Sequence, residues 1–260
     1  MHFHSGNNDY IFTLSKAASP PYGIDFKPSG GRPTGRFTNG RTISDIIGRV
    51  PLREQVNNFE ESRNNMVKTM GENNTMEFLK KTTFSVAIGF NDVLNYFQPS
   101  IPFFVLTIKL KRLHELGARK FVVAGIGPLG CIPFIRAISL SGRCFVEVNE
   151  IIQGYNMKLN GVLDQLNQEL GPEAIFLYAN SFDIFMKIIV NYHQYGCANV
   201  NEPCCGGYFP LFVCFKSRDA NRSSALCDDR SKYVFWDAYH PTEAGNMIIA
   251  ERLLDGDMKV

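Results

Sequence analysis

The sequence lacks several features that identify whole classes of protein. No apolar run in its 260 residues approaches the length of a membrane span, and no internal repeat or low-complexity tract occurs. The formal net charge is only +2, which gives no electrostatic reason to expect nucleic acid or an anionic membrane as a partner. The first ten residues contain neither the basic nor the apolar region of a signal peptide, so we predict none in the chain as written.

The composition that remains is that of an ordinary globular protein. Hydrophobic residues make up 45% of the chain and charged residues 20%. A chain of 260 residues is long enough for a sizeable α/β domain with a full core. We therefore predict one domain over residues 1–260.

The cysteines indicate disulfide bonds. There are seven, and five of them lie between residues 197 and 227, including the adjacent pair Cys204-Cys205. Adjacent thiols lack the Cys-x-x-Cys spacing that grips zinc, so we predict no metal site and a disulfide-stapled loop region. The odd count leaves at least one thiol without an intramolecular partner. Cys131 and Cys144 are the first pair we expect, since a Gly/Pro loop leads out from one and "SGRC" ends at the other.

Disulfides imply an oxidising compartment, so the cysteine content predicts a secreted protein. Two N-glycosylation acceptor triplets agree with this localisation, at Asn73 and at Asn221, although such triplets are common by chance.

Hydrophobic periodicity predicts strands that alternate with helices. The strands are expected at 83–88, 120–125 and 174–179, and the helices at 53–70, 105–116, 146–170, 183–192 and 242–254. Residues 18–40 are rich in Gly and Pro and predict a long irregular surface segment. The alternation predicts a parallel sheet with helices on both faces, in which ligands bind at the carboxyl ends of the strands.

Polar candidates for chemistry occur where these strands end. Asp237 stands three residues before His240, and a carboxylate at that spacing can orient an imidazole that acts as a general base. An isolated Asp-x-x-His is more often a loop histidine beside a capping aspartate. Asn91 follows the first strand and can donate to an oxyanion, but Asn-Asp after a strand is more often turn chemistry. Gly89 permits an unusual turn or the close approach of a ligand.

Taken together, six separated stretches resemble one family. They are "SGNNDYIFTLSKAASPPYGIDF", "GRPTGRFTNGRTISDII", "IGFND", "LGARKFVVAGIGPLGCIP", "YNMKLN" and "DAYHPTEAGN". In order and over nearly the whole chain, they resemble the plant GDSL esterases/lipases of the SGNH hydrolase superfamily. The resemblance implies a flavodoxin-like α/β/α sandwich, secretion, and hydrolysis of small-molecule or lipid carboxylic esters without a cofactor. It also implies that Asp237 and His240 are catalytic and that Asn91 is an oxyanion donor.

The sequence departs from the family pattern at two places. The position of the family's nucleophilic serine falls on Met1, and Ser5 falls on a variable position, so we do not assign the nucleophile to Ser5. The segment that carries the family's oxyanion-hole glycine is absent after Gly48. We therefore expect the first two strands of the fold to be missing and the chain to be an incomplete hydrolase that hydrolyses esters hardly at all. The alternatives are a non-catalytic ligand-binding protein and a non-functional fragment.

Overall fold

The computed structural model describes residues 20–33, 38–39, 56–87, 89–90, 103–139, 141–206, 214, 225–255 and 258–259. The chain divides into two compact units. We call one the sheet unit; it comprises Arg49–Gly127, Glu150–Phe182 and Gly256–Val260. We call the other the disulfide unit; it comprises Met1–Gly48, Pro128–Asn149 and Asp183–Asp255.

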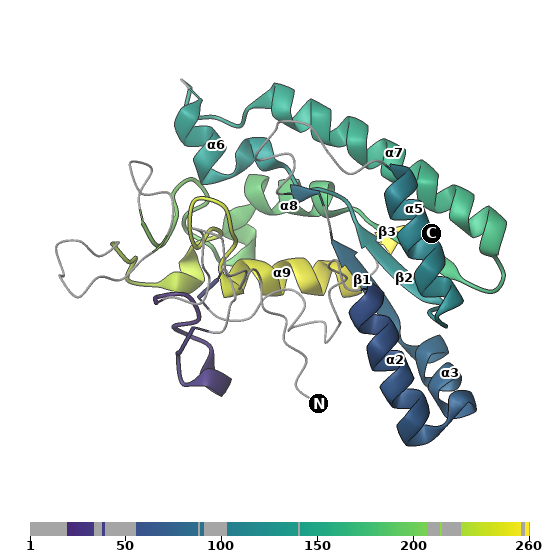
Figure 1. Ribbon diagram of the computed structural model, residues 1–260. Coiled ribbons are helices and arrows are strands. Elements are labelled where there is room, and N and C mark those ends of the chain that lie inside the picture. The colour runs from purple at the N-terminus through teal and green to yellow at the C-terminus, as the bar shows by residue number, and fades with distance from the viewer. Residues whose placement is uncertain are drawn as a thin grey trace. The chain divides into compact units, whose positions relative to one another are not determined.

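The sheet unit is built on a sheet in the order β1-β2-β3-β4 (Figure 1). The first three strands, β1 (Thr83–Ala87), β2 (Lys120–Ala124) and β3 (Ile175–Ala179), are parallel, and β4 (Met258–Lys259) runs antiparallel to β3. Each parallel strand is a short β-prone run whose apolar side chains are largely buried, as expected for strands covered on both faces. The register aligns the last residue of each, so the three carboxyl ends lie level along one edge of the sheet.

Helices accompany these strands in the sheet unit. They are α2 (Val56–Met70), α3 (Glu72–Lys81), α5 (Phe103–Glu115) and α7 (Val146–Leu170), of which α7 begins in the disulfide unit. The buried face of α7 keeps the three- and four-residue spacing of an amphipathic helix, through Ile152, Tyr155, Leu159, Leu163 and Leu166. The aromatic rings of Phe121 and Phe176 stack across β2 and β3 with their centroids 4.4 Å apart. These contacts form the core beneath the carboxyl edge.

The disulfide unit contains less regular structure. Its helices are α6 (Pro133–Ile138), most of α8 (Ser181–Val190), α9 (Glu243–Leu254) and the short 3-10 helices η1 (Lys27–Ser29), η2 (Leu129–Cys131), η3 (Tyr192–Tyr195) and η5 (Arg230–Lys232). Three disulfides hold its loops, joining Cys131 to Cys144, Cys204 to Cys227 and Cys205 to Cys214. Cys197 is a buried free thiol. The expected pairing of Cys131 with Cys144 and the unpaired seventh cysteine are both confirmed.

The predicted fold class is confirmed, because the chain forms a mixed α/β structure with a parallel sheet and helices, as in a flavodoxin-like fold. All of the predicted strands and helices are present, with ends that shift by a few residues. The elements that were missed are α3, α6, β4 and the short 3-10 helices. Within the described residues, β1 pairs with β2 alone, so it forms an edge of the sheet there, as expected for a fold without the first two strands. None of the helices in the described ranges is both long and apolar enough to cross a membrane.

The prediction that residues 18–40 form a surface segment is wrong for five of the described residues, because Pro21, Tyr22, Gly23, Thr38 and Asn39 are all buried. Tyr22, Thr38 and Asn39 are 2%, 1% and 4% exposed. Each of these side chains hydrogen-bonds to a part of the chain that lies around residue 240, and such distant partners leave no trace in the local composition of the segment.

Candidate active site

The candidate site is a tight turn that runs from Asp237 to His240 just before α9. Trp236 donates its backbone N–H to the carbonyl of His240 at 2.8 Å, which closes the turn, and Phe235 and Pro241 form an antiparallel bridge beside it. Pro241 then leads into the helix. This arrangement places Asp237 and His240 on the same turn with their side chains facing each other.

The turn itself supplies two hydrogen-bond donors to the Asp237 side chain. This side chain is fully buried, and its Oδ1 accepts the backbone N–H groups of Tyr239 at 2.8 Å and His240 at 2.7 Å. The turn therefore fixes this carboxylate oxygen in place beside the histidine.

The imidazole of His240 meets this carboxylate through one ring nitrogen. Nδ1 lies 2.9 Å from Oδ1 and 3.0 Å from Oδ2 of Asp237, and the His240 side chain is 34% exposed. A carboxylate accepts and does not donate, so the proton in this contact belongs on Nδ1. The lone pair of the neutral ring is then on Nε2, the arrangement in which a histidine serves as a general base.

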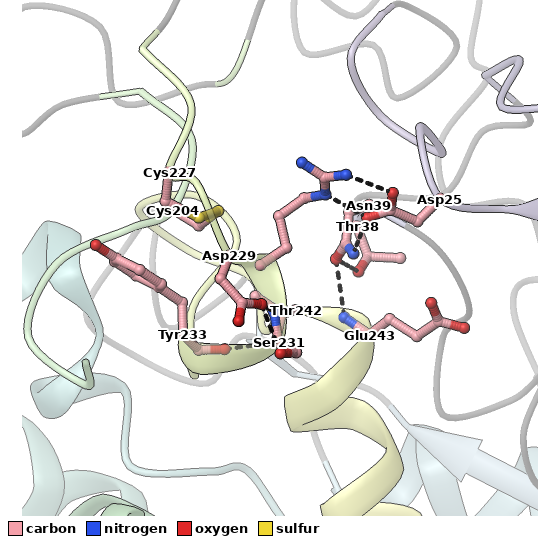
Figure 2. Close-up of polar contacts among 11 residues, drawn as sticks. Asp25, Thr38, Asn39, Cys204, Cys227, Asp229, Ser231, Tyr233, Thr242 and Glu243 are labelled. Carbon is pink, nitrogen blue, oxygen red and sulfur yellow. Dashed lines mark hydrogen bonds and ion pairs between the residues drawn. A yellow bond between two sulfur atoms is a disulfide. The ribbon is translucent and has the colours of Figure 1, made fainter. Parts of the chain in front are cut away.

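The start of α9 fixes the far end of the turn. Thr242 is the N-cap residue, and its hydroxyl oxygen accepts the backbone N–H of Gly245 at 3.0 Å and donates to the carbonyl of Tyr233 at 2.7 Å. The backbone N–H of Glu243 donates to Oδ1 of Asn39 at 2.9 Å, as Figure 2 shows. Together these bonds satisfy donors that a helix start leaves unpaired.

A second polar cluster ties the segment around Asn39 to the chain before the turn (Figure 2). The Arg230 guanidinium grips the Asp25 carboxylate through two bonds, of 2.5 Å to Oδ2 and 2.8 Å to Oδ1, and Asn39 donates to Oδ2 at 2.8 Å. Burial works to raise the pKa of Asp25, but the hydrogen bonds from Arg230 and Asn39 outweigh it and lower this pKa below its usual value. The cluster is therefore ionised at neutral pH.

Sequence reasoning missed Tyr22, whose hydroxyl donates to Oδ2 of Asp237 at 2.7 Å. This bond joins two residues that lie 215 positions apart in the chain. The stretch "PPYGIDF" belongs to one of the resembling motifs, but nothing in its local pattern indicates which residue the tyrosine contacts.

In the sheet unit, glycines line the ends of the parallel strands. Gly89 follows β1 with φ of +98°, and a Cβ there would lie 3.0 Å from Cδ1 of Ile126. The unusual turn predicted at Gly89 is therefore present. Beyond β2, a Cβ on Gly125 would lie 2.3 Å from the Tyr178 hydroxyl oxygen. Asn156 of α7 pins the same loop by bonding both the N–H and the carbonyl of Ile126 at 2.8 Å.

Two of the predicted site positions can be compared with the structure, and the others cannot. Asp237 and His240 are in direct contact, as their spacing predicted. Asn91 lies outside the described residues, as do Met1 and Ser5. Its convergence with His240 on the carboxyl edge of the sheet stays a prediction. Among the described residues, no group of His, Cys, Asp or Glu side chains is arranged to hold a metal ion.

Comparison with known proteins identifies the family of the chain. The family model of GDSL-like lipases and acylhydrolases matches residues 22–253. A GDSL esterase/lipase of Arabidopsis thaliana is 52% identical over 321 aligned positions, which cover 98% of this chain and 87% of the relative. Two further GDSL esterases/lipases of the same plant are 36% and 37% identical, each over 98% of this chain, covering 82% and 85% of their own lengths.

The first of these alignments is longer than the chain itself. It spans 321 positions, whereas the whole chain has 260 residues. Because it covers almost all of this chain, the relative must carry internal segments that have no counterpart here. The family-model match over residues 22–253 nevertheless includes both the Asp237–His240 turn and the parallel strands. The chain therefore belongs to the family of GDSL-like lipases and acylhydrolases, which implies ester hydrolase chemistry.

Proposed function

We propose that Asp237 and His240 form the acid–base pair of a serine-type carboxylic ester hydrolase site. The observation that carries this proposal is the paired contact of His240 Nδ1 with the buried Asp237 carboxylate, at 2.9 and 3.0 Å. In such a pair, Nε2 of the histidine takes the proton of an attacking hydroxyl, and the carboxylate stabilises the imidazolium that forms. A histidine that is 34% exposed is accessible to such a partner.

Asn91 is the oxyanion donor in this proposal. The family motif assigns this role to the asparagine of Gly-x-Asn-Asp, which here begins at Gly89. The left-handed backbone at Gly89 supports the assignment, since it turns the chain sharply at the end of β1 just before Asn91. A side-chain amide at that place stabilises the negative charge that develops on the carbonyl oxygen in acyl transfer.

We also propose that the 260-residue chain hydrolyses esters at no more than a background rate. The family's serine position falls on Met1, and the segment with the second oxyanion donor has no equivalent after Gly48. The excess of aligned positions over the length of the chain supports internal loss of residues. Removing the nucleophilic serine of a serine hydrolase lowers kcat by about 10⁶-fold, and losing one oxyanion donor lowers it by about 10²–10³-fold.

The test is hydrolysis of a p-nitrophenyl ester by the parent chain, by three single-residue variants of it, and by an extended form with and without His240→Ala. We expect the parent chain, His240→Ala and the matched control His193→Ala to show the same background rate, because a base without a nucleophile accelerates nothing. The extended form adds a Gly-Asp-Ser-Leu segment and the missing glycine strand, and we expect turnover from it that His240→Ala abolishes. Substantial turnover by the parent chain that is lost in Ser5→Ala would show instead that Ser5 is the nucleophile.

We propose that the protein is secreted and glycosylated and acts in lipid metabolism on small-molecule or lipid esters. The three disulfides support an oxidising compartment. Asn73 lies in the first turn of α3 with an exposed side chain, so an attached glycan would project into solvent. Expression through a secretory pathway should give a glycoform that Asn73→Gln lightens by one glycan, as seen by mass spectrometry. An unchanged mass would remove Asn73 as an acceptor.

A further inference from the structure

Tyr22 is a buried hydroxyl donor that contacts the candidate acid–base pair from a distant segment. Its side chain is 2% exposed and its hydroxyl lies 2.7 Å from Oδ2 of Asp237. The two oxygens of the Asp237 carboxylate thus accept hydrogen bonds from different parts of the chain. Oδ1 receives the backbone N–H groups of Tyr239 and His240, whereas Oδ2 receives the phenol of Tyr22.

The chemistry of Tyr22 keeps it a donor at every pH at which the protein works. Burial, and then the neighbouring Asp237 carboxylate, raise the pKa of Tyr22 far above its ordinary value. The hydroxyl therefore stays protonated, and the ionised carboxylate that it faces can only accept. A hydrogen bond of this kind, to a charged acceptor in a buried place, is stronger than one between neutral groups.

The segment around Tyr22 is itself anchored to the same turn. Gly23 donates its backbone N–H to the carbonyl of Thr38 at 2.8 Å, and Asp25 donates to that of Asn39 at 2.7 Å. Asn39 in turn accepts from the backbone of Glu243, at the start of α9 (Figure 2). The segment therefore contacts the chain on both sides of the Asp237–His240 turn, which fixes the place from which Tyr22 reaches the carboxylate.

We propose that Tyr22 is a positioning residue that acts through Asp237 to hold the His240 ring in its Nδ1-protonated tautomer. The inference rests on the proposed function of the Asp237–His240 pair. His240 Nδ1 lies almost equally far from both carboxylate oxygens, a geometry that depends on the rotation of the carboxylate about its last bond. The backbone donors fix one oxygen, and the Tyr22 hydroxyl fixes the other. Without Tyr22, Oδ2 loses a donor in a fully buried site, and the carboxylate is free to rotate about its last bond.

The experiment reads the state of the histidine directly and needs no hydrolysis. In the ¹⁵N-labelled chain, the Nδ1 proton of His240 should give a downfield NMR signal that exchanges slowly with water, assigned by its absence from His240→Gln. In Tyr22→Phe we expect this proton to exchange roughly tenfold faster, or more, the factor expected on losing a hydrogen bond to a charged group. The ¹⁵N shifts should also show a mixture of both tautomers.

The matched control is Tyr233→Phe, which removes the same hydroxyl from another tyrosine packed against the same buried cluster. We expect its Nδ1 proton to exchange as in the parent chain. An unchanged rate in Tyr22→Phe overturns the inference, as does an equal rise in both variants or the lack of a slowly exchanging Nδ1 signal in the parent. Failure of the extended protein, with its Gly-Asp-Ser-Leu segment and glycine strand, to hydrolyse esters would count against the proposed function and leave this result intact.

A second measurement covers the case in which Tyr22→Phe does not fold. With ¹³Cζ-labelled tyrosine, the most alkali-resistant resonance of the parent chain should belong to Tyr22, because burial, and then the Asp237 charge, raise its pKa. In Asp237→Asn that resonance should titrate at a lower pH than in the parent. A tyrosine spectrum that Asp237→Asn leaves unchanged shows that the two groups are not coupled and overturns the inference.

Discussion

Removing the disulfide between Cys131 and Cys144 should destabilise the disulfide unit by an amount that depends on the length of the loop that the bond closes. The two cysteines are 13 positions apart, and a cross-link that closes a loop of this length stabilises the folded state by about 3 kcal/mol. The double substitution Cys131→Ala with Cys144→Ala frees the loop in the unfolded chain without leaving an odd thiol. With a urea m-value of about 2–3 kcal/mol/M, the unfolding midpoint should fall by about 1–1.5 M.

The chain contains a built-in reporter for this measurement. Trp236 is its single tryptophan, fully buried in the same unit, so fluorescence during urea unfolding follows this unit directly. The loop closed by the disulfide contacts the chain two residues after Trp236, because Phe134 donates its backbone N–H to the carbonyl of Ala238 at 2.9 Å. Cys197→Ala is the matched control, because it removes a buried sulfur that closes no loop, and it should shift the midpoint less. A double variant that unfolds with the parent midpoint would refute the loop-closure argument.

Three further substitutions test the rest of the structure. Gly125→Ala should lower the free energy of unfolding by about 1–3 kcal/mol, because the new Cβ would lie 2.3 Å from the Tyr178 hydroxyl oxygen. Gly161→Ala should instead stabilise α7 by up to about 1 kcal/mol, because no atom lies within 4 Å of the added Cβ. Equal melting temperatures for Gly125→Ala and Gly161→Ala, measured by circular dichroism, would show that a Cβ at position 125 does not crowd Tyr178. Asp25→Asn should destabilise the protein at pH 6 but not well below pH 3.8. The pKa of Asp25 is lowered in the folded state, so its ion pair with Arg230 stabilises the fold above the unfolded-state pKa. This stabilisation is lost as the pH falls and the folded carboxylate takes up a proton. An equal effect of Asp25→Asn at both pH values would contradict the assigned charge state.

The parts of the fold that the sequence predicts are those whose signals are local. The strands and α7 follow from apolar periodicity that spans each element, and the Cys131–Cys144 bond follows from two cysteines at the ends of a short loop. The Asp237–His240 contact is equally local, since one turn contains both residues. Such features survive in a single sequence because the partners are close along the chain.

The missed parts depend on residues that are far apart. Tyr22 is buried because its partner lies 215 positions away, and the Gly- and Pro-rich composition around it indicates only irregular structure. The two residues of β4 form a strand because they meet β3, a tertiary effect that no periodicity reveals. The helix α3 was missed for a different reason: Asn73, Asn74 and Thr75 near its start, directly after Gly71, are weak helix formers and hid the better ones that follow.

The adjacent cysteines 204 and 205 bond in different directions, and this has a consequence for how the protein matures. Exchanging their partners would close two loops of almost the same lengths, so chain entropy does not select the native pairs. The native pairs are selected instead by backbone hydrogen bonds that position the cysteines. The N–H groups of Cys204 and Cys205 donate to the carbonyls of Phe235 and Trp236, and the N–H of Cys227 donates to the carbonyl of Cys204. The segment that leads into Asp237 thus serves as the template on which the correct thiols meet. A displaced template would therefore appear as scrambled disulfides as well as in the chemistry of His240.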